Sequence, residues 1–317
     1  MTAKMKKKII QILSVTFGIY IASGCISAAV MINLFIKRPQ GGWPNPLEHL
    51  SGSRAPFEKQ LKQSKEWLDL QKTEKVEITS FDGLKLAGLM LEQEKDVDSK
   101  GCVSLMHGHH SRAWFEFSGF YQYFFENGYN ILLADQRSHG NSQGKFLTFG
   151  IKERFDCLGW VNFANERYGQ EKPLWLCGVS MGSSTVLMSL GLEMPANVKG
   201  VIADCGFTSP AEIISVCIKR DYHLPDKLLM PFINLGTQLF CGFGLNEYSV
   251  QEALKNNKIP VLFVHGKNDA FVPFYMSQKN YEACTAPKKF LQTDAMHAVN
   301  FLHNTAEYEQ ALKDFMN

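Results

Sequence analysis

The fold of this chain is decided by the run Pro173-Leu174-Trp175-Leu176-Cys177-Gly178-Val179-Ser180-Met181-Gly182. Its first half is apolar and predicts a buried strand that ends where the glycines begin. The G-x-S-x-G pattern is typical of a tight turn from a strand into a helix, in which small residues flank a serine that projects from the sheet edge. Residues 183–190 predict that helix. We therefore expect Ser180 to be a nucleophile. Taken alone, the pentapeptide also fits a glycine-rich turn with an incidental serine.

Two downstream segments supply the partners that such a serine needs. Residues 259–266 form an apolar run that predicts a second buried strand, and Asp269 follows in the next loop. Residues 288–292 predict a short last strand, with His297 just beyond its end. In this order the histidine can take the serine proton, while the aspartate orients the histidine.

These segments resemble the α/β-hydrolase superfamily from about Val76 to the end of the chain. The region from Asp135 to Gly144, with Glu153 and Asp156, is similar to a bacterial branch of monoacylglycerol lipases, lysophospholipases and acyl-aminoacyl peptidase-like enzymes. N-terminally membrane-anchored serine hydrolases of Gram-positive bacteria look similar as well. The resemblance implies an α/β-hydrolase fold, with a mostly parallel eight-stranded sheet flanked by helices and a helical cap insertion.

The remaining site residues follow from this resemblance. Some lipases take their acid from the preceding strand, so Asp204, after the predicted strand at residues 198–203, is an alternative to Asp269. The turn geometry assigns one oxyanion-hole donor to the backbone N–H of Met181. In similar lipases the residue after His-Gly supplies the second donor, which here is the backbone N–H of His109. Because this donor is not a side chain, we expect His109→Ala to have a mild effect.

Metal and cofactor sites were weighed against the same residues. His107, His109 and His110 lack the spacings of common zinc sites, and the sequence has no H-E-x-x-H motif. It has no G-x-x-x-x-G-K-[ST] loop and no basic stripe with interleaved aromatic residues. The net charge of +2 comes from six basic residues near the N-terminus, without which 27 basic residues face 31 acidic ones. We expect no metal, no cofactor and no nucleic-acid partner.

An apolar segment near the N-terminus predicts a membrane-spanning helix. Residues 9–36 contain no charged residue and exceed the roughly 20 residues that cross a bilayer. A cleaved secretory signal is an alternative, but its apolar core is usually only about 7 to 15 residues long. Lipidation of Cys25 is another, because residues 22–25 resemble a degenerate lipobox. We expect residues 1–38 to form a single-pass anchor.

The side of the membrane on which the domain lies stays open. Four lysines precede the apolar segment and two basic residues follow it, which favours a cytoplasmic N-terminus and an extracytoplasmic catalytic domain. The seven cysteines after Cys25 form no C-x-x-C pair, and several fall in predicted strands. Such small buried thiols suit a reducing compartment better.

The rest of the chain divides into two parts. Residues 39–75 predict a juxtamembrane linker rich in proline and glycine, followed by an amphipathic helix that lies on the domain or at the lipid surface. The apolar positions of this helix are Phe57, Leu61, Trp67, Leu68 and Leu70. Residues 76–317 predict the catalytic domain, in which strands alternate with helices, among them an aromatic helix at 115–125. The long connection at about 207–258 predicts a helical cap, broken into short pieces by Pro225, Pro231, Gly236, Gly242 and Gly244.

These features predict a serine hydrolase that cleaves carboxylic esters through an acyl-enzyme, with a small-molecule or lipid-like substrate. The apolar cap either packs on the core or lines an acyl pocket. An acyl-aminoacyl or prolyl-type serine peptidase is the alternative, because the same triad supports it, although the chain lacks the N-terminal propeller of that family. A non-catalytic protein that retains the fold is the second alternative, since function resides in a site and not in a fold.

Overall fold

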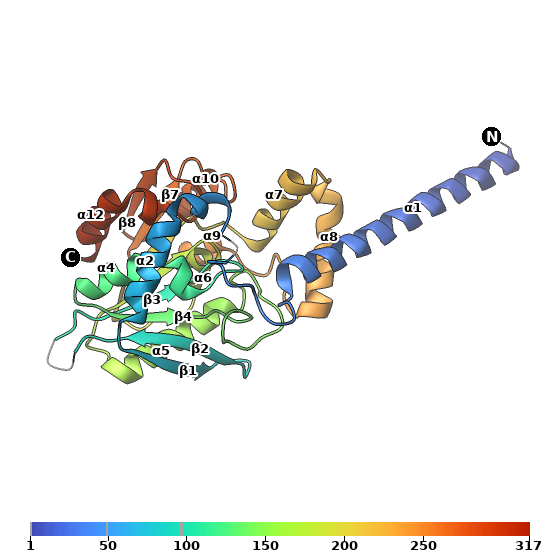
Figure 1. Ribbon diagram of the computed structural model, residues 1–317. Coiled ribbons are helices and arrows are strands. Elements are labelled where there is room, and N and C mark those ends of the chain that lie inside the picture. Colours follow the sequence, from blue (N-terminus) through green and yellow to red (C-terminus); the bar gives the residue numbers. More distant parts are fainter. Residues whose placement is uncertain (1, 49, 95–97) are drawn as a thin grey trace.

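The computed structural model describes residues 2–48, 50–94 and 98–317. It contains an eight-stranded sheet in the order β1-β2-β4-β3-β5-β6-β7-β8 (Figure 1). Strand β2 is antiparallel to β1 and β4, and the other neighbouring strands are parallel. The strands are β1 (Thr73–Thr79), β2 (Lys85–Leu91), β3 (Cys102–Met106), β4 (Asn130–Ala134), β5 (Leu174–Val179), β6 (Val198–Asp204), β7 (Val261–Gly266) and β8 (Lys288–Thr293). The predicted mostly parallel, eight-stranded α/β fold is confirmed.

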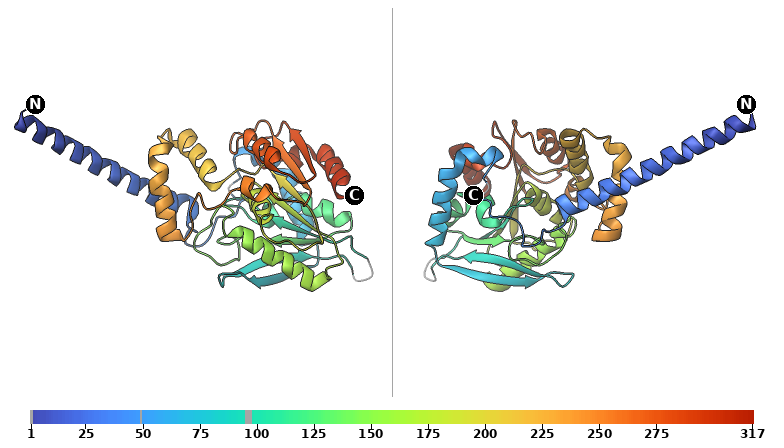
Figure 2. Two further views of the ribbon diagram at one scale, coloured as in Figure 1. Left: turned by 180° about the vertical axis from the view of Figure 1, so that it is seen from behind. Right: turned by 45° about the vertical axis from the view of Figure 1, so that its right-hand side comes forward.

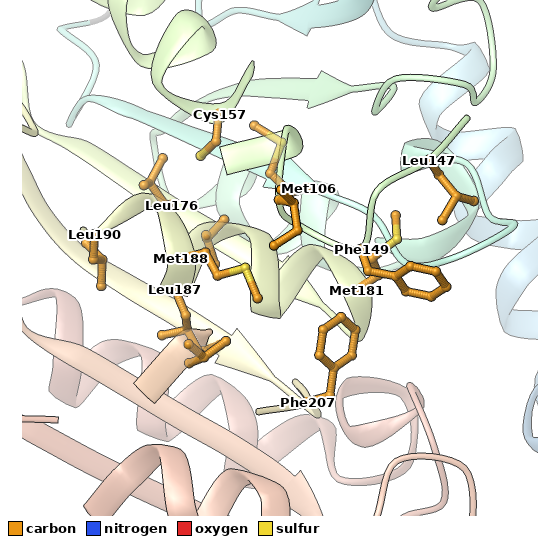
Figure 3. Packing of buried hydrophobic residues seen from close by; sticks show 14 of the residues in the cluster. Met106, Leu147, Phe149, Cys157, Leu176, Met181, Leu187, Met188, Leu190 and Phe207 are labelled. Carbon is orange, nitrogen blue, oxygen red and sulfur yellow. The ribbon is translucent and has the colours of Figure 1, made fainter. Parts of the chain in front are cut away.

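Helices cover both faces of the sheet, which is why strands such as β3, β5 and β7 are buried along their whole length. One face packs on α5 (Glu153–Tyr168), α6 (Met181–Ser189), α9 (Val250–Leu254) and α10 (Phe274–Ala283). The other packs on α2 (Glu58–Asp69), α3 (Ala113–Glu116), α4 (Phe120–Glu126), α11 (Asn300–His303) and α12 (Thr305–Met316). Figure 3 shows the first face around α6, where Met181 and Leu187 lie among other buried side chains. All nine residues of α6 are buried, so this helix is held by the core on every side.

The aromatic segment predicted as one helix at 115–125 is two helices, α3 and α4. The chain bends at Gly119, which has a φ of 85°. A Cβ atom at this position would lie only 2.8 Å from the Phe301 ring. The single-helix prediction was wrong because the bend depends on contact with α11, which is distant in sequence.

The N-terminal helix projects away from the domain. Helix α1 (Ala3–Met31) continues into the π-helical turn η1 (Ile32–Ile36), and together they are long and apolar enough to cross a membrane. Figures 1 and 2 show the N-terminus at the far end of this helix. The buried residues of α1 are Gly24, Ala28 and Met31, all in its last third. The first two thirds of the helix are therefore largely free of the domain.

The cap lies between β6 and β7 and is helical, as predicted. It consists of α7 (Pro210–Tyr222), α8 (Asp226–Gly236), the π-helical turn η3 (Thr237–Cys241) and α9. Helix α8 packs along α1, and a Cβ atom at Gly24 would collide with the Phe232 ring. Pro231 lies inside α8, so the prediction that it breaks the cap was wrong. Its missing amide donor costs one hydrogen bond within the helix, yet α8 continues through this position along α1.

Residues 37–46 form no regular helix, as the prolines and glycines predicted, but this linker is bound to the domain. The Arg38 guanidinium donates to the carbonyls of Gly140 and Ser142, and Trp43 Nε1 donates to the Ser138 carbonyl at 3.0 Å. Trp43 is buried.

The short 3₁₀ helix η2 (Gly52–Phe57) and α2 follow the linker. Leu61 and Leu68 of α2 are buried against the domain. Leu70 is 84% exposed, so its assignment to the apolar stripe was wrong, because α2 ends one residue before it.

Candidate active site

Ser180 stands at the turn between β5 and α6. Its backbone has φ 57° and ψ −119°, a strained conformation for a residue with a side chain. A Cβ atom at Gly178 would collide with the Gly182 carbonyl oxygen, and one at Gly182 with the Met106 carbonyl oxygen. The G-x-S-x-G spacing is therefore a steric requirement of this turn.

The structure brings Ser180, His297 and Asp269 together from the ends of β5, β8 and β7. His297 Nε2 lies 2.9 Å from Ser180 Oγ, and His297 Nδ1 lies 2.7 Å from Asp269 Oδ2. Because the carboxylate can only accept, Nδ1 carries the ring proton and Nε2 is left to accept the serine hydroxyl proton. The Asp269 side chain is fully buried, and that of His297 is 18% exposed. The three side chains thus have the geometry of a nucleophile, a base and an orienting acid.

Asp269 is held as a carboxylate by its surroundings. Its Oδ1 accepts the backbone N–H groups of Phe271 and Val272 at 2.8 and 2.9 Å. Burial opposes ionisation, but attraction to His297 and hydrogen bonds from His265 and His297 outweigh it, so the pKa of Asp269 lies below its ordinary value. His265 Nε2 lies 3.1 Å from Asp269 Oδ2. The sequence analysis gave this second histidine no part in the site, although it lies four residues before Asp269 at the end of β7.

Asp204, the alternative acid, lies at the end of β6 and makes a different contact. Its Oδ1 accepts from Asn300 Nδ2 at 2.6 Å. Burial raises the pKa of Asp204 to about 6. Within the described residues it makes no hydrogen bond to His297, whose Nδ1 is bonded to Asp269. The geometry therefore favours Asp269 as the acid.

The loop after β3 lies beside Ser180 and carries the second predicted oxyanion-hole donor. A Cβ atom added to Gly108 would lie 3.2 Å from Ser180 Cβ. Across the described parts of the chain, the backbone N–H groups of Met181 and His109 have no protein acceptor, whereas that of His110 donates to His139 Nε2 at 3.1 Å. Both predicted donors are thus unoccupied next to the nucleophile.

Two of the three histidine rings of this loop are hydrogen-bonded inside the protein, whereas Nε2 of His110 has no partner among the described residues. His107 Nε2 accepts from the Gln136 N–H at 3.0 Å, and His109 Nε2 donates to the Phe35 carbonyl at 2.7 Å. The rings of Trp43, His110 and His109 stack, with successive centroids 3.5 Å apart. Burial lowers the pKa of His109 to about 4, so its ring is neutral at neutral pH. The contacts to Phe35 and Trp43 were not predicted.

Two residues of this arrangement and one cysteine lie close enough together to suggest a metal site. Cys205, Asp269 and His297 offer ligand atoms within 4.8 Å of one another. Asp269 and His297 already share a hydrogen bond, and burial raises the pKa of the Cys205 thiol well above its ordinary value. These residues fit a triad better than a cation site.

Two cavities of different character flank Ser180. One, of about 220 Å³, is mainly apolar and is lined by side chains from the cap, α6, the N-terminal helix and the segment before α5, among them Phe149, Met181, Phe207, Ile213, Ile214, Met31 and Phe35. Figure 3 shows Phe149 and Phe207 beside Met181. The other, of about 230 Å³, lies toward His297 and contains the ion pair of Arg54 with Glu116. The site therefore offers an apolar side and a polar side to a substrate.

Comparison with known proteins finds similarity to serine hydrolases and esterases. The family model described as "Serine aminopeptidase, S33" matches residues 97–234, and the one described as "Serine hydrolase (FSH1)" matches residues 189–307. The uncharacterized protein YqkD of Bacillus subtilis is 28% identical over 61% of this chain and 64% of its own length, so the alignment leaves over a third of that relative unmatched. The uncharacterized membrane protein YNL320W of Saccharomyces cerevisiae is 25% identical over 62% of this chain and 63% of its own. The structure of the esterase Pf2001 of Pyrococcus furiosus superposes with a TM-score of 0.65 at 24% identity, covering 89% of this chain and 99% of that one.

Proposed function

We propose that the chain is a serine hydrolase of the α/β-hydrolase superfamily, in line with its two matching family models, and that it cleaves carboxylic esters through Ser180, His297 and Asp269. The observation that carries this proposal is the hydrogen-bonded series from Ser180 Oγ to His297 Nε2 at 2.9 Å and from His297 Nδ1 to Asp269 Oδ2 at 2.7 Å. A serine hydroxyl is a weak nucleophile, and this series is the arrangement that activates it.

The reaction runs in two halves. His297 takes the Ser180 proton as Oγ attacks the ester carbonyl carbon, and Asp269 stabilises the imidazolium that forms. The backbone N–H groups of Met181 and His109 donate to the carbonyl oxygen as it gains charge. His297 then protonates the leaving alcohol, which gives an acyl-enzyme. His297 next takes a proton from a water molecule as the water attacks the acyl carbon. His297 then returns this proton to Ser180 Oγ, and the acid is released.

The two cavities suggest how the ester is oriented. The apolar cavity suits an acyl chain, and the cavity with Arg54 and Glu116 suits a polar alcohol. A volume of about 220 Å³ is below the roughly 300 to 1,000 Å³ of typical ligand pockets, which favours short or medium-length acyl chains over long ones. A single-chain, lipid-like ester fits this description.

We also propose that α1 anchors the protein as a single-pass helix, with the domain extracytoplasmic. The large apolar side chains of the neighbouring cap support a position at the lipid surface. Four such side chains lie within α8 and η3 and are between 52% and 71% exposed: Leu228, Leu235, Leu239 and Phe240. We expect the protein to resist carbonate extraction from membranes. We also expect protease added to intact spheroplasts to degrade its domain. Carbonate-soluble protein would refute the anchor, and protection from protease would place the domain inside.

Hydrolysis of p-nitrophenyl esters compared with aminoacyl p-nitroanilides tests the reaction. A serine peptidase is the alternative function, because one matching family model is described as a serine aminopeptidase. We expect kcat/KM for the esters to exceed that for the anilides by at least about 10². The opposite ratio would favour the peptidase. No turnover of either class by protein that is folded would favour the non-catalytic alternative.

A further inference from the structure

The end of the N-terminal helix reaches the site that the cap and the sheet build. Met31 and Phe35 line the apolar cavity together with Ser180 itself. Met31 is only 7% exposed, and Phe35 is partly buried against the core. The Phe35 ring also meets Tyr222 at the end of α7, with centroids 6.2 Å apart and the rings nearly perpendicular.

The same turn of helix is hydrogen-bonded to the loop after β3, which carries His109. The Phe35 carbonyl accepts from His109 Nε2 at 2.7 Å. His109 is half-buried, its ring is neutral, and it stacks on Phe149 with centroids 5.5 Å apart. Phe149 lines the apolar cavity as well. The helix end, the His109 ring and the cavity wall thus form one packed unit.

The helix cannot easily shift relative to the cap. A Cβ atom at Gly236 of α8 would lie 3.1 Å from Ala28 Cβ, and Tyr20 Oη donates to the Leu228 carbonyl at 3.0 Å. The chain just after the helix is fixed too, because the Leu147 N–H donates to the Ile36 carbonyl at 3.0 Å. The position of Met31 and Phe35 against the cavity is therefore set from both sides.

We propose that Met31 and Phe35, at the end of the N-terminal helix, form a wall of the acyl-binding pocket and determine which acyl chains the enzyme accepts. This inference rests on the proposed function, since it assigns the apolar cavity to the acyl chain. The segment that predicts membrane attachment is then also a specificity element, and the substrates it fits are amphiphilic esters whose acyl chain packs against Met31 and Phe35.

The experiment compares two wall variants with a matched control on the full-length protein in detergent. Met31→Trp fills the cavity and Phe35→Ala enlarges it, whereas Leu34, on the same turn, is 56% exposed and does not line the cavity. Phe35→Ala keeps the backbone carbonyl that His109 uses, so it alters pocket shape without removing that hydrogen bond. Titration of active sites with a fluorophosphonate normalises every rate to competent enzyme.

The readout is kcat/KM for p-nitrophenyl octanoate divided by that for the acetate. We expect Met31→Trp to lower this ratio about tenfold or more, because a few methylene contacts are worth roughly 10- to 200-fold in a pocket. Phe35→Ala should raise the ratio for decanoate over octanoate about threefold, and Leu34→Trp and Leu34→Ala should match the wild type.

Unchanged ratios in both wall variants, or equal shifts in the Leu34 variants, would overturn the inference. If Met31→Trp gives no titratable sites, Phe35→Ala decides. A wild-type enzyme that hydrolyses no ester would refute the proposed function instead, so the two failures are distinguishable.

Discussion

The proposed catalytic rim and the end of the N-terminal helix meet at one cavity but depend on different kinds of information. The proposed rim consists of Ser180, Asp269 and His297, each within a few residues of a strand end in the same sheet. Parallel strands bring their carboxyl ends to one edge, so local patterns are enough to place these residues together. The helix end, residues 31–35, reaches the same cavity only through packing on α7, α8 and the His109 loop. The proposed role of the first region follows from local sequence, and that of the second from the assembled fold.

The largest expected effect breaks the rim itself. Ser180→Ala removes the nucleophile and should lower kcat for p-nitrophenyl butyrate by about 10⁴ to 10⁶. Circular dichroism and thermal unfolding should match the wild type, because alanine leaves the turn intact. Activity within about tenfold of the wild type would show that another residue attacks the ester.

Next in size is the contrast between the two buried acids. Asp269→Asn should lower kcat by roughly 10³ to 10⁴, since it loses the carboxylate that fixes the His297 tautomer. Asp204→Asn should stay within about threefold, because an amide oxygen can still accept from Asn300. Measuring both on titrated enzyme decides between them, and a large loss confined to Asp204→Asn would reverse the assignment.

The lowered pKa of His109 predicts a pH effect on stability. The pKa of His109 is lowered to about 4 in the folded protein, while the unfolded chain has the ordinary value near 6.5. As the pH falls below about 6.5, the unfolded state gains a proton that the folded state does not, so stability decreases until the pH nears 4. We expect about 2 kcal/mol less stability at pH 5 than at pH 7 from this ring.

Urea unfolding of wild type and His109→Gln at both pH values checks this expectation. The variant, which has no titrating ring at that position, should lose less stability on acidification. An equal loss in both proteins would remove His109 as the cause.

The smallest effect separates the backbone of His109 from its ring. Its N–H remains the proposed oxyanion donor, and on that basis alone His109→Ala is mild. Because the ring also bonds the Phe35 carbonyl, we now expect about a tenfold loss in kcat with little change in KM, and partial recovery in His109→Gln, whose amide can donate to the same carbonyl. The full loss of an oxyanion donor, about 10² to 10³, should not be reached. Wild-type kcat in His109→Ala would show that the contact with the helix end does not position the loop.

Much of the fold was predictable because its signals are local. The buried strands β3, β5 and β7 are predicted by mainly apolar runs. The turn at Ser180 needs glycine two residues before and two residues after the serine. The contact of His109 with Phe35 spans 74 residues and has no sequence pattern, and the stacking of Trp43 on His110 is equally non-local. The predictions of one helix across Gly119 and of a break at Pro231 were wrong for the same reason. At each position the chain packs on an element that is distant in sequence.

The most direct test of the central claim is the site and rate of labelling by a fluorophosphonate, followed by peptide mass spectrometry. We predict a single adduct on Ser180 in the wild type, at least about 10² slower labelling in His297→Ala, and none at this peptide in Ser180→Ala. Stoichiometric modification of a different residue, or an unchanged labelling rate without His297, would contradict the proposal that these side chains form one catalytic unit.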